Sequence, residues 1–158
     1  MVPTAGSGPT DGAAFLLAQL GHRAAALFAE QMATLQLTPP HAGILRVIAS
    51  EPGLSQQALS TRLDVLPSRV VAYVDEFEDR GYVERRRNPD DRRQHALYLT
   101  AAGKKLMRKV SELARQHEHR FTAGLDPEQR GALVSLLAML ARQQGLTPRV
   151  HPGYRTLK

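Results

Sequence analysis

The chain has 158 residues, of which 42% are hydrophobic and 23% are charged, as in an ordinary globular protein. It has no cysteine, which excludes disulfides, thiolate metal sites and cysteine redox sensing. It shows neither a signal-peptide pattern nor an apolar run of about 18 residues, so we expect a soluble, cytoplasmic protein without a membrane partner. The net charge of +6 favours an anionic partner such as nucleic acid.

The N-terminal third is predicted to contain a disordered tail and two helices. Residues 1–10 are rich in Gly, Pro, Ser and Thr, which is typical of disorder. Asp11 is predicted to cap a helix that runs to about Gln36, with apolar residues at three- and four-residue spacing. Thr38 followed by Pro39 predicts the start of a second helix, which ends at residues 51–53.

Two shorter helices are expected next. Ser55 is predicted to cap the first, with Ala58, Leu59 and Leu63 facing inward. Residues 64–66 form the turn between the two. The second opens at Pro67 and ends at Gly81, and its apolar face carries Val70, Val74 and Phe77.

The apolar period then changes from that of a helix to that of a strand. Residues 82–86 and 94–99 are predicted to pair as a hairpin, with turn residues at 88–91. The hairpin is basic: five arginines lie between Glu84 and Arg93. Thr100 is predicted to cap a fifth helix to about Thr122, and a sixth opens at 126–128.

These elements predict a mainly α fold with a small β-hairpin wing. Residues 37–100 have the parts of a winged helix-turn-helix lobe for binding DNA. The ranges 11–36 and 101–144 are expected to form a helical dimerisation region, because they carry more apolar surface than one small lobe can bury. Residues 145–158 are expected to form a C-terminal tail without periodicity.

The order and spacing of two segments resemble the MarR family of bacterial transcription regulators. The first runs from Val74 to Arg85 and is similar to the end of that family's recognition helix and the start of its wing. The second combines Asp91-Arg92-Arg93 with the segment from Leu97 to Gly103. The resemblance covers about residues 13–143. It implies a homodimer that binds a palindromic operator in double-stranded DNA, and a repressor more than an activator.

The helix from Pro67 to Gly81 is expected to place its exposed side in the major groove, since its other side is apolar. That side offers Pro67, Ser68, Arg69, Ala72 and Tyr73, with Arg69 as the main candidate for a base contact. Two alternatives stay open, namely an ion pair of Arg69 with Asp75 or Glu76 and packing of Tyr73 on the lobe surface.

Phosphate contacts are expected from the preceding helix and from the wing. Gln56, Gln57 and Ser60 lie on that helix, although the glutamines could equally be ordinary surface residues. In the wing, the resemblance assigns Arg92 to the minor groove and Arg93 to a phosphate, with Asp91 orienting an arginine. The arginines at positions 85–87, among them Arg85 and Arg86, are expected to add phosphate contacts, unless the hairpin is only a solvated charged edge.

The resemblance also implies a small-molecule site between the dimer helices and the DNA lobe, for which no certain cofactor can be named. A small aromatic effector is one candidate, and its expected lining is Phe15, His22, Arg23, His41 and Arg46. A zinc site assembled from distant residues is another, with unknown ligands, because no two histidines are four residues apart. The alternative for His22 and His41 is a surface or capping role.

Two other classes of function are an enzyme and a winged-helix module that does not read a DNA sequence. An enzyme is not expected, because the chain lacks a phosphate-binding glycine loop, a nucleophile elbow and a metalloprotease helix. The second alternative is a winged-helix module that binds proteins, or that binds DNA without sequence specificity or effector control. Binding to heparin without selection of a DNA sequence would favour this alternative.

Overall fold

The computed structural model describes residues 12–87, 95–148 and 150. Within them the elements, in chain order, are α1 (Ala13–Ala33), α2 (Pro39–Ser50), α3 (Gln56–Leu63), α4 (Pro67–Asp79), β1 (Val83–Arg87), β2 (His95–Leu99), α5 (Ala101–Phe121) and α6 (Pro127–Gln143). The predicted tail at 1–10, the hairpin turn and Asp91, Arg92 and Arg93 lie outside the described residues. The mainly α fold with a two-stranded hairpin is confirmed.

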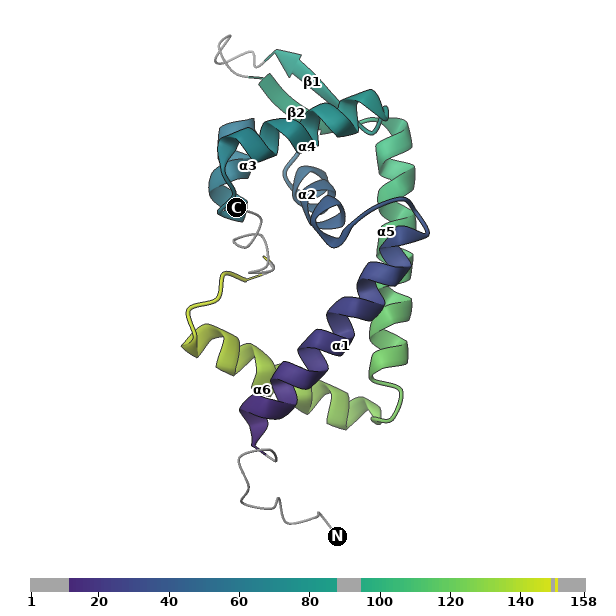
Figure 1. Cartoon of the computed structure of the whole chain (residues 1–158), viewed down its shortest axis with the longest axis vertical. Coiled ribbons are helices and arrows are strands. Elements are labelled where there is room, and N and C mark those ends of the chain that lie inside the picture. The colour runs from purple at the N-terminus through teal and green to yellow at the C-terminus, as the bar shows by residue number, and fades with distance from the viewer. Residues whose placement is uncertain (1–11, 88–94, 149, 151–158) are drawn as a thin grey trace.

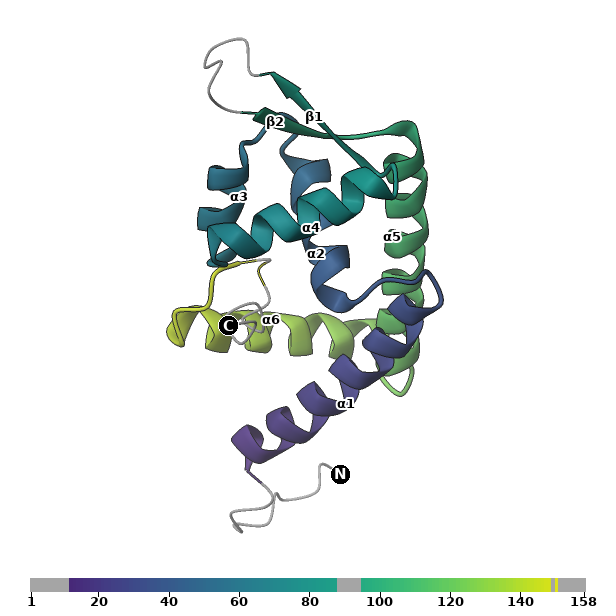
Figure 2. The same ribbon diagram turned by 45° about the horizontal axis from the view of Figure 1, so that its top comes forward.

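The helices are arranged as one lobe, which α2, α3 and α4 form with the hairpin, and three arms, which are the helices α1, α5 and α6. Figure 1 shows α2, α3, α4 and the hairpin gathered at one end, while α6 and the N-terminal part of α1 lie at the other. The long helix α5 runs along the side of the molecule and joins the two ends, as the turned view in Figure 2 also shows. The helices α1 and α2 both pack against α5.

The lobe holds the core. Phe77, Val70 and Val74 from α4 are fully buried, as predicted, together with Ile44, Leu45 and Ile48 from α2. Burial of these side chains is the main stabilising contribution of the lobe, at roughly 1.5–3 kcal/mol for each large one. In contrast, α6 buries none of its residues. The arm regions therefore expose apolar surface that the lobe does not cover.

The hairpin has a third backbone partner that the sequence did not predict. β1 and β2 pair antiparallel, with Arg85 opposite Leu97. The Gly53 N–H donates to the Leu97 carbonyl at 2.8 Å, and the Leu97 N–H donates to the Leu54 carbonyl at 2.9 Å. The residues between α2 and α3 thus extend the sheet and anchor the base of the wing to the lobe. This segment is too short to show the apolar alternation by which a strand is recognised in a sequence.

Several predicted boundaries were wrong by a few residues. The N-cap of α1 is Gly12 rather than Asp11, and α1 ends at Ala33 rather than near Gln36. Gln36 has a φ of 55°, a left-handed conformation that ends a helix. The first strand starts at Val83, one residue later than expected. The caps Ser55 and Thr100 are confirmed, since their hydroxyls accept from the Ala58 and Gly103 N–H groups.

One inward assignment in α3 was also wrong. Ala58 is exposed, whereas Leu59, Ser60 and Leu63 are buried. Leu59 and Leu63 are one turn apart and define the buried side, and each residue is about 100° around the helix from the next. Either neighbour of Leu59 could therefore lie on the buried side of the helix. Ser60 is the neighbour that is buried, and its side chain has a hydrogen-bond partner inside the lobe.

A close backbone approach joins α5 to the start of the wing. A Cβ atom added to Gly103 would lie 2.0 Å from the Tyr82 carbonyl oxygen. At the same junction the Thr100 hydroxyl donates to the Gly81 carbonyl at 2.6 Å, and the Thr100 N–H donates to the Tyr82 carbonyl at 3.1 Å. Only glycine lets the first turn of α5 sit this close to the chain that leads into β1. This contact sets where the wing begins relative to α5.

Candidate nucleic-acid interface

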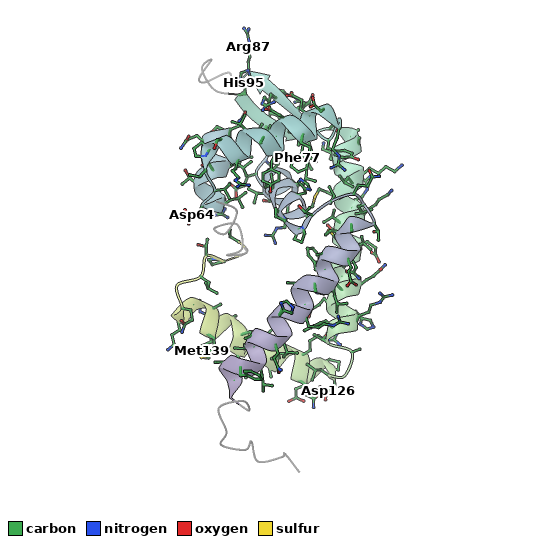
Figure 3. The ribbon with its side chains drawn as sticks, viewed as in Figure 1. Asp64, Phe77, Arg87, His95, Asp126 and Met139 are labelled. Atoms are coloured by element: carbon green, nitrogen blue, oxygen red, sulfur yellow. The ribbon has the colours of Figure 1, made fainter. Side chains whose placement is uncertain are left out.

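The helix α4 presents a solvent-exposed side that is suited to reading DNA. Its core side is the buried row of Val70, Val74 and Phe77, and Figure 3 shows Phe77 between α4 and the helices beneath it. Four of the predicted residues, together with Glu76, line one shallow hollow of about 320 Å³: Ser68, Arg69, Ala72 and Tyr73. Pro67 is exposed at the start of the helix. The structure therefore brings four of the five predicted α4 residues onto one surface.

The alternative of an intramolecular ion pair for Arg69 is contradicted. Asp75 pairs with Arg85, and Glu76 pairs with Arg80 and His41. Arg69 forms no ion pair with any residue in the part of the chain that the structure describes. A half-buried guanidinium without a carboxylate partner keeps its donors available for a base edge or a phosphate.

Val71 is a residue of this helix that the sequence analysis missed. Its side chain is 41% exposed, although valine is most often buried. Exposure of an apolar side chain on a recognition helix allows contact with a thymine methyl group. The one feature of the sequence that could have indicated its exposure is its position, because it follows Val70 directly and therefore lies off the apolar stripe.

A polar network holds α4 against the lobe. The ring of His41, whose side chain is only 12% exposed, packs edge-on against Tyr73 and Phe77. Arg80 donates to the Glu76 carboxylate at 3.0 Å and to the Gln36 carbonyl at 3.0 Å. The alternative for Tyr73 is thus partly borne out, because its ring packs on His41 while remaining in the hollow.

The hydrogen bonds of His41 define the tautomer of its neutral ring. The Thr38 N–H donates to Nδ1 at 3.0 Å, so Nδ1 carries no proton. In the neutral ring the proton is then on Nε2, which lies 3.2 Å from Glu76 Oε2 and donates to it. Both ring nitrogens are occupied, as expected for the capping role. His41 therefore connects the start of α2 to the middle of α4.

Burial raises the pKa of the Tyr73 phenol above its ordinary value, although the charge of Arg69 opposes this and that of Glu76 adds to it. The phenol therefore stays protonated at neutral pH and remains a hydrogen-bond donor. Tyr73 offers a donor beside Arg69 on the α4 surface.

Arg85, for which a phosphate contact was predicted, forms hydrogen bonds inside the lobe. Its guanidinium donates to the carboxylates of Asp75 and Glu78 on α4, and its Nε donates to Gln56 Oε1 on α3 at 2.8 Å. The side chain is only 17% exposed. Three of the five N–H donors of Arg85 are engaged by partners inside the lobe, so the structure does not support the predicted phosphate contact. Arg85 instead fastens the wing to both helices of the helix-turn-helix.

Burial alone lowers the pKa of Arg85, but the hydrogen bonds to Asp75 and Glu78 outweigh it, so the pKa lies above its ordinary value. The guanidinium is therefore charged at neutral pH. Titration of Arg85 itself consequently does not weaken the contacts that attach the wing.

Replacing Arg85 by alanine is expected to lower the free energy of unfolding by about 2 kcal/mol, because two carboxylates and an amide lose their partner. Urea unfolding at one fixed protein concentration measures this. Arg87→Ala removes an arginine from the exposed end of the same strand and is expected to change stability by less than about 0.5 kcal/mol. Equal effects of the two substitutions would contradict the role assigned to Arg85.

Neighbouring arginines of β1 have different surroundings because successive side chains of a strand point to opposite faces. Arg86 lies over the Tyr98 ring, 4.5 Å from its centroid, and its Nε donates to Glu84 at 3.0 Å. Arg87 is exposed and extends with His95 from the outer end of the hairpin in Figure 3. Arg86 remains largely exposed, so a phosphate contact by it stays a prediction, as it does for Arg92 and Arg93.

The predictions for α3 are only partly supported. Ser60 is buried, and its hydroxyl donates to the Val65 carbonyl at 2.6 Å. A phosphate contact by Ser60 is therefore wrong, since its hydroxyl closes the turn between α3 and α4. Gln56 is engaged by Arg85 through its side-chain oxygen, which leaves its amide group as the donor. Gln57 is exposed and keeps its predicted availability.

The five residues expected to line an effector site do not come together within one chain. Phe15, His22 and Arg23 are exposed on α1. His41 faces α4, whereas Arg46 lines a cleft between α2 and α5. Arg46 follows His41 by five positions, which turns their side chains to different sides of α2. The effector site stays a prediction, and in the single chain its expected lining is not grouped, because His41 and Arg46 point to different sides of α2.

Two further features bear on function. No group of three or more histidine, aspartate or glutamate side chains among the described residues is placed to hold a metal ion. Among the described helices, none combines the length and the apolar character needed to cross a membrane.

Comparison with known proteins identifies the family. The sequence model of the MarR family matches residues 35–94, which span α2, α3, α4 and β1. A putative transcriptional regulatory protein for the hcr operon of Thauera aromatica is 37% identical over 122 residues, covering 77% of this chain and 74% of the relative. The chain belongs to the MarR family. It is a transcription regulator, and the expectation that it is not an enzyme agrees with this family.

Three further relatives and solved structures agree with this assignment. The regulator HosA of Escherichia coli O111:H- is 27% identical, covering 73% of this chain and 90% of its own. The transcriptional repressor CouR, in a structure bound to a 23-mer DNA duplex, is 34% identical with a TM-score of 0.73, covering 84% of this chain and 94% of its own. MarR of E. coli in its apo form has a TM-score of 0.72 at 22% identity, covering 82% and 96%, and shows the shared fold.

Proposed function

We propose that this MarR-family regulator acts in the cytoplasm as a homodimer that binds a palindromic operator and represses transcription. The observation that carries the proposal is the exposed side of α4, where Arg69 lacks a carboxylate partner among the described residues and lines one shallow hollow together with Tyr73. Gln57 and the exposed arginines of the wing are proposed to contact phosphates on either side. The similar repressor CouR, solved on a DNA duplex, supports this direction of control.

The proposal of a homodimer rests on the exposed apolar surface of the arms. On α6, Leu133, Leu136, Leu137 and Leu140 form one stripe, and all four are exposed in the single chain. The N-terminal half of α1 exposes Phe15 and the leucines that follow it. An apolar stripe of this extent is normally covered. A second copy related by a two-fold axis covers both helices at once and sets two α4 helices about one DNA turn apart, ~34 Å.

Selection from a pool of random DNA duplexes tests the proposal. The enriched sequences are expected to contain a two-fold palindrome with half-site centres about ten base pairs apart. Repeating the selection with Arg69→Ala is expected to relax the preference at one symmetric pair of positions, because a good arginine–guanine contact discriminates by about 1–3 kcal/mol. Lys105→Ala, which removes the same charge from an exposed position of α5, is the control and should return the original palindrome.

A pool without an enriched motif, at a salt concentration where binding persists, would contradict sequence-specific binding. It would favour the second candidate, a winged-helix module that binds proteins or unspecific DNA. Enrichment of a single half-site rather than a palindrome would contradict the dimer while leaving the role of α4 intact.

A further inference from the structure

His41 is a titratable side chain that lies directly behind the exposed side of α4. It is only 12% exposed, and its ring packs edge-on against Tyr73 and Phe77. Its Nε2 lies 3.2 Å from one oxygen of the Glu76 carboxylate, while the other oxygen accepts from Arg80. Histidine is the side chain that ordinarily changes its charge near pH ~6.5, within the physiological range. A change in the charge of this ring therefore reaches the surface of α4 through residues that it already contacts.

The surroundings of His41 accommodate the ring in either charge state. In the neutral ring, Nδ1 accepts from the Thr38 N–H at 3.0 Å. The Thr38 hydroxyl oxygen lies 3.1 Å from the same nitrogen and can accept from Nδ1–H once the ring is charged. Thr38 is exposed, so water can then hydrate its N–H. Nε2 donates to Glu76 in both states, and in the charged ring this hydrogen bond becomes an ion pair.

The charged groups around His41 come from α4. Glu76 contacts its ring directly, Arg80 pairs with Glu76, and no other described residue forms an ion pair with His41 or Glu76. Tyr73 adds a phenol that is protonated at neutral pH, and the connection between α1 and α2 adds the Gln36 carbonyl, which accepts from Arg80. With a neutral ring, one carboxylate and one guanidinium give this cluster a net charge of zero, and protonation of the ring raises it to +1.

The cluster borders the surface that is proposed to read DNA. Glu76 and Tyr73 line the hollow on α4 together with Arg69. DNA carries one negative charge for about every 1.7 Å of its axis, so a carboxylate at this surface opposes binding and an added positive charge favours it. Bound DNA therefore favours the protonated ring of His41. By linkage, protonation of the ring favours the binding of DNA.

We propose that His41 is a positioning residue that makes operator binding respond to pH, with an affinity that rises as the pH falls through the range in which histidines titrate. The charged ring offsets the charge of Glu76 and holds its carboxylate against the lobe, which leaves Arg69 and Tyr73 to face the DNA. The gain in affinity is complete below this range and is lost as the pH rises through it. The inference rests on the proposed operator-binding function and adds its regulation.

Fluorescence anisotropy with a labelled duplex of the selected operator, at constant ionic strength, tests the inference. For the proposed homodimer, which holds two copies of His41, the dissociation constant is expected to fall about fivefold or more from about pH 7.5 to about pH 5.5. His41→Gln is the main variant, because glutamine at this position of a capping box keeps an acceptor for the Thr38 N–H but takes no proton. The ratio of its dissociation constants at the two pH values is expected to be about twofold or less.

Two other histidines provide matched controls. His119→Gln removes a histidine from an exposed position of α5 and should leave this ratio unchanged. His95→Gln removes the exposed histidine at the outer end of the hairpin, beside the wing arginines, and should keep most of the pH dependence. Loss of the pH dependence in His95→Gln, together with its retention in His41→Gln, would place the response in the wing and overturn the proposal.

Glu76→Gln provides a second test that leaves the ring in place. With His41 neutral, this variant gives the cluster a net charge of +1, which is the charge that protonation gives the unmodified cluster. Its operator affinity at about pH 7.5 is therefore expected to rise about fivefold, toward that of the unmodified protein at about pH 5.5. An affinity below that of the unmodified protein would contradict the role assigned to the charge of Glu76.

The titration of the His41 ring in the protein without DNA separates this inference from the proposed function. Its Cε1–H resonance, assigned by its loss in His41→Gln, is expected to shift in NMR spectra between about pH 7.5 and about pH 5.5. A resonance that does not shift, or a pH dependence of binding that survives in His41→Gln, would overturn the inference and leave operator binding intact. Absence of operator binding at every pH would instead contradict the proposed function, and the inference with it.

Discussion

Replacing Gly103 by alanine is expected to lower the free energy of unfolding by about 3 kcal/mol or more, because the new methyl group overlaps a backbone atom. The added Cβ would lie 2.0 Å from the Tyr82 carbonyl oxygen. Neither a helix backbone nor the strand-forming chain can yield as a flexible side chain does, so α5 must move away from the wing. Chemical unfolding monitored by circular dichroism measures the loss, at one protein concentration so that association is held constant.

Gly131→Ala is the matched control for this substitution. Gly131 also lies inside a helix, but nothing stands within 4 Å of a Cβ placed there. It lies on the side of α6 opposite the leucine stripe, so a partner subunit on that stripe leaves it free. Alanine is expected to stabilise this helix by about 0.5–1 kcal/mol. If both alanines had small effects, the close approach of α5 to Tyr82 would not be a feature of the folded protein.

Placing glutamate at both Leu136 and Leu140 is expected to convert the proposed homodimer into a monomer. Both leucines are exposed in the single chain, Leu136 by 57%, and α6 buries no residue of its own. By symmetry the change removes four leucines from the interface, at about 1.5 kcal/mol or more each, which raises the dissociation constant about 10⁴-fold. Sedimentation equilibrium across a range of protein concentrations measures this directly.

Lys105→Gln with Lys109→Gln is the control for net charge, because it also shifts the charge by two units but on α5. It should leave the association state unchanged, and both variants should keep their helical circular dichroism. A dimer of undiminished stability in the leucine variant would show that α6 is not the interface. The exposed stripe would then need another partner.

Much of the lobe follows from local sequence rules. Val70, Val74 and Phe77 repeat at helical spacing and are buried as predicted. The caps Ser55 and Thr100 hold the first turns of α3 and α5 through their hydroxyls. Such interactions join residues three or four apart, so they can be recognised before the fold is known.

The errors in the predicted DNA surface have a common physical cause. Arg85 and Ser60 were assigned to phosphates because their side chains suit that contact, yet each is taken by partners inside the lobe. Arg85 meets Asp75 ten residues away and Gln56 twenty-nine residues away. The composition of the wing indicated its positive charge, but it did not indicate which arginines form ion pairs with carboxylates of the lobe.

The sequence by itself determined the helical and strand segments, the apolar side of α4 and the resemblance to the MarR family. These depend on periodicity and on motifs with fixed spacing, which are properties of neighbouring residues. Only the tertiary structure decided that Arg69 stays without a carboxylate partner among the described residues, and that His41 on α2 meets Glu76 on α4. Charge pairing and concave surfaces depend on which distant segments meet, and packing of the whole chain sets those meetings.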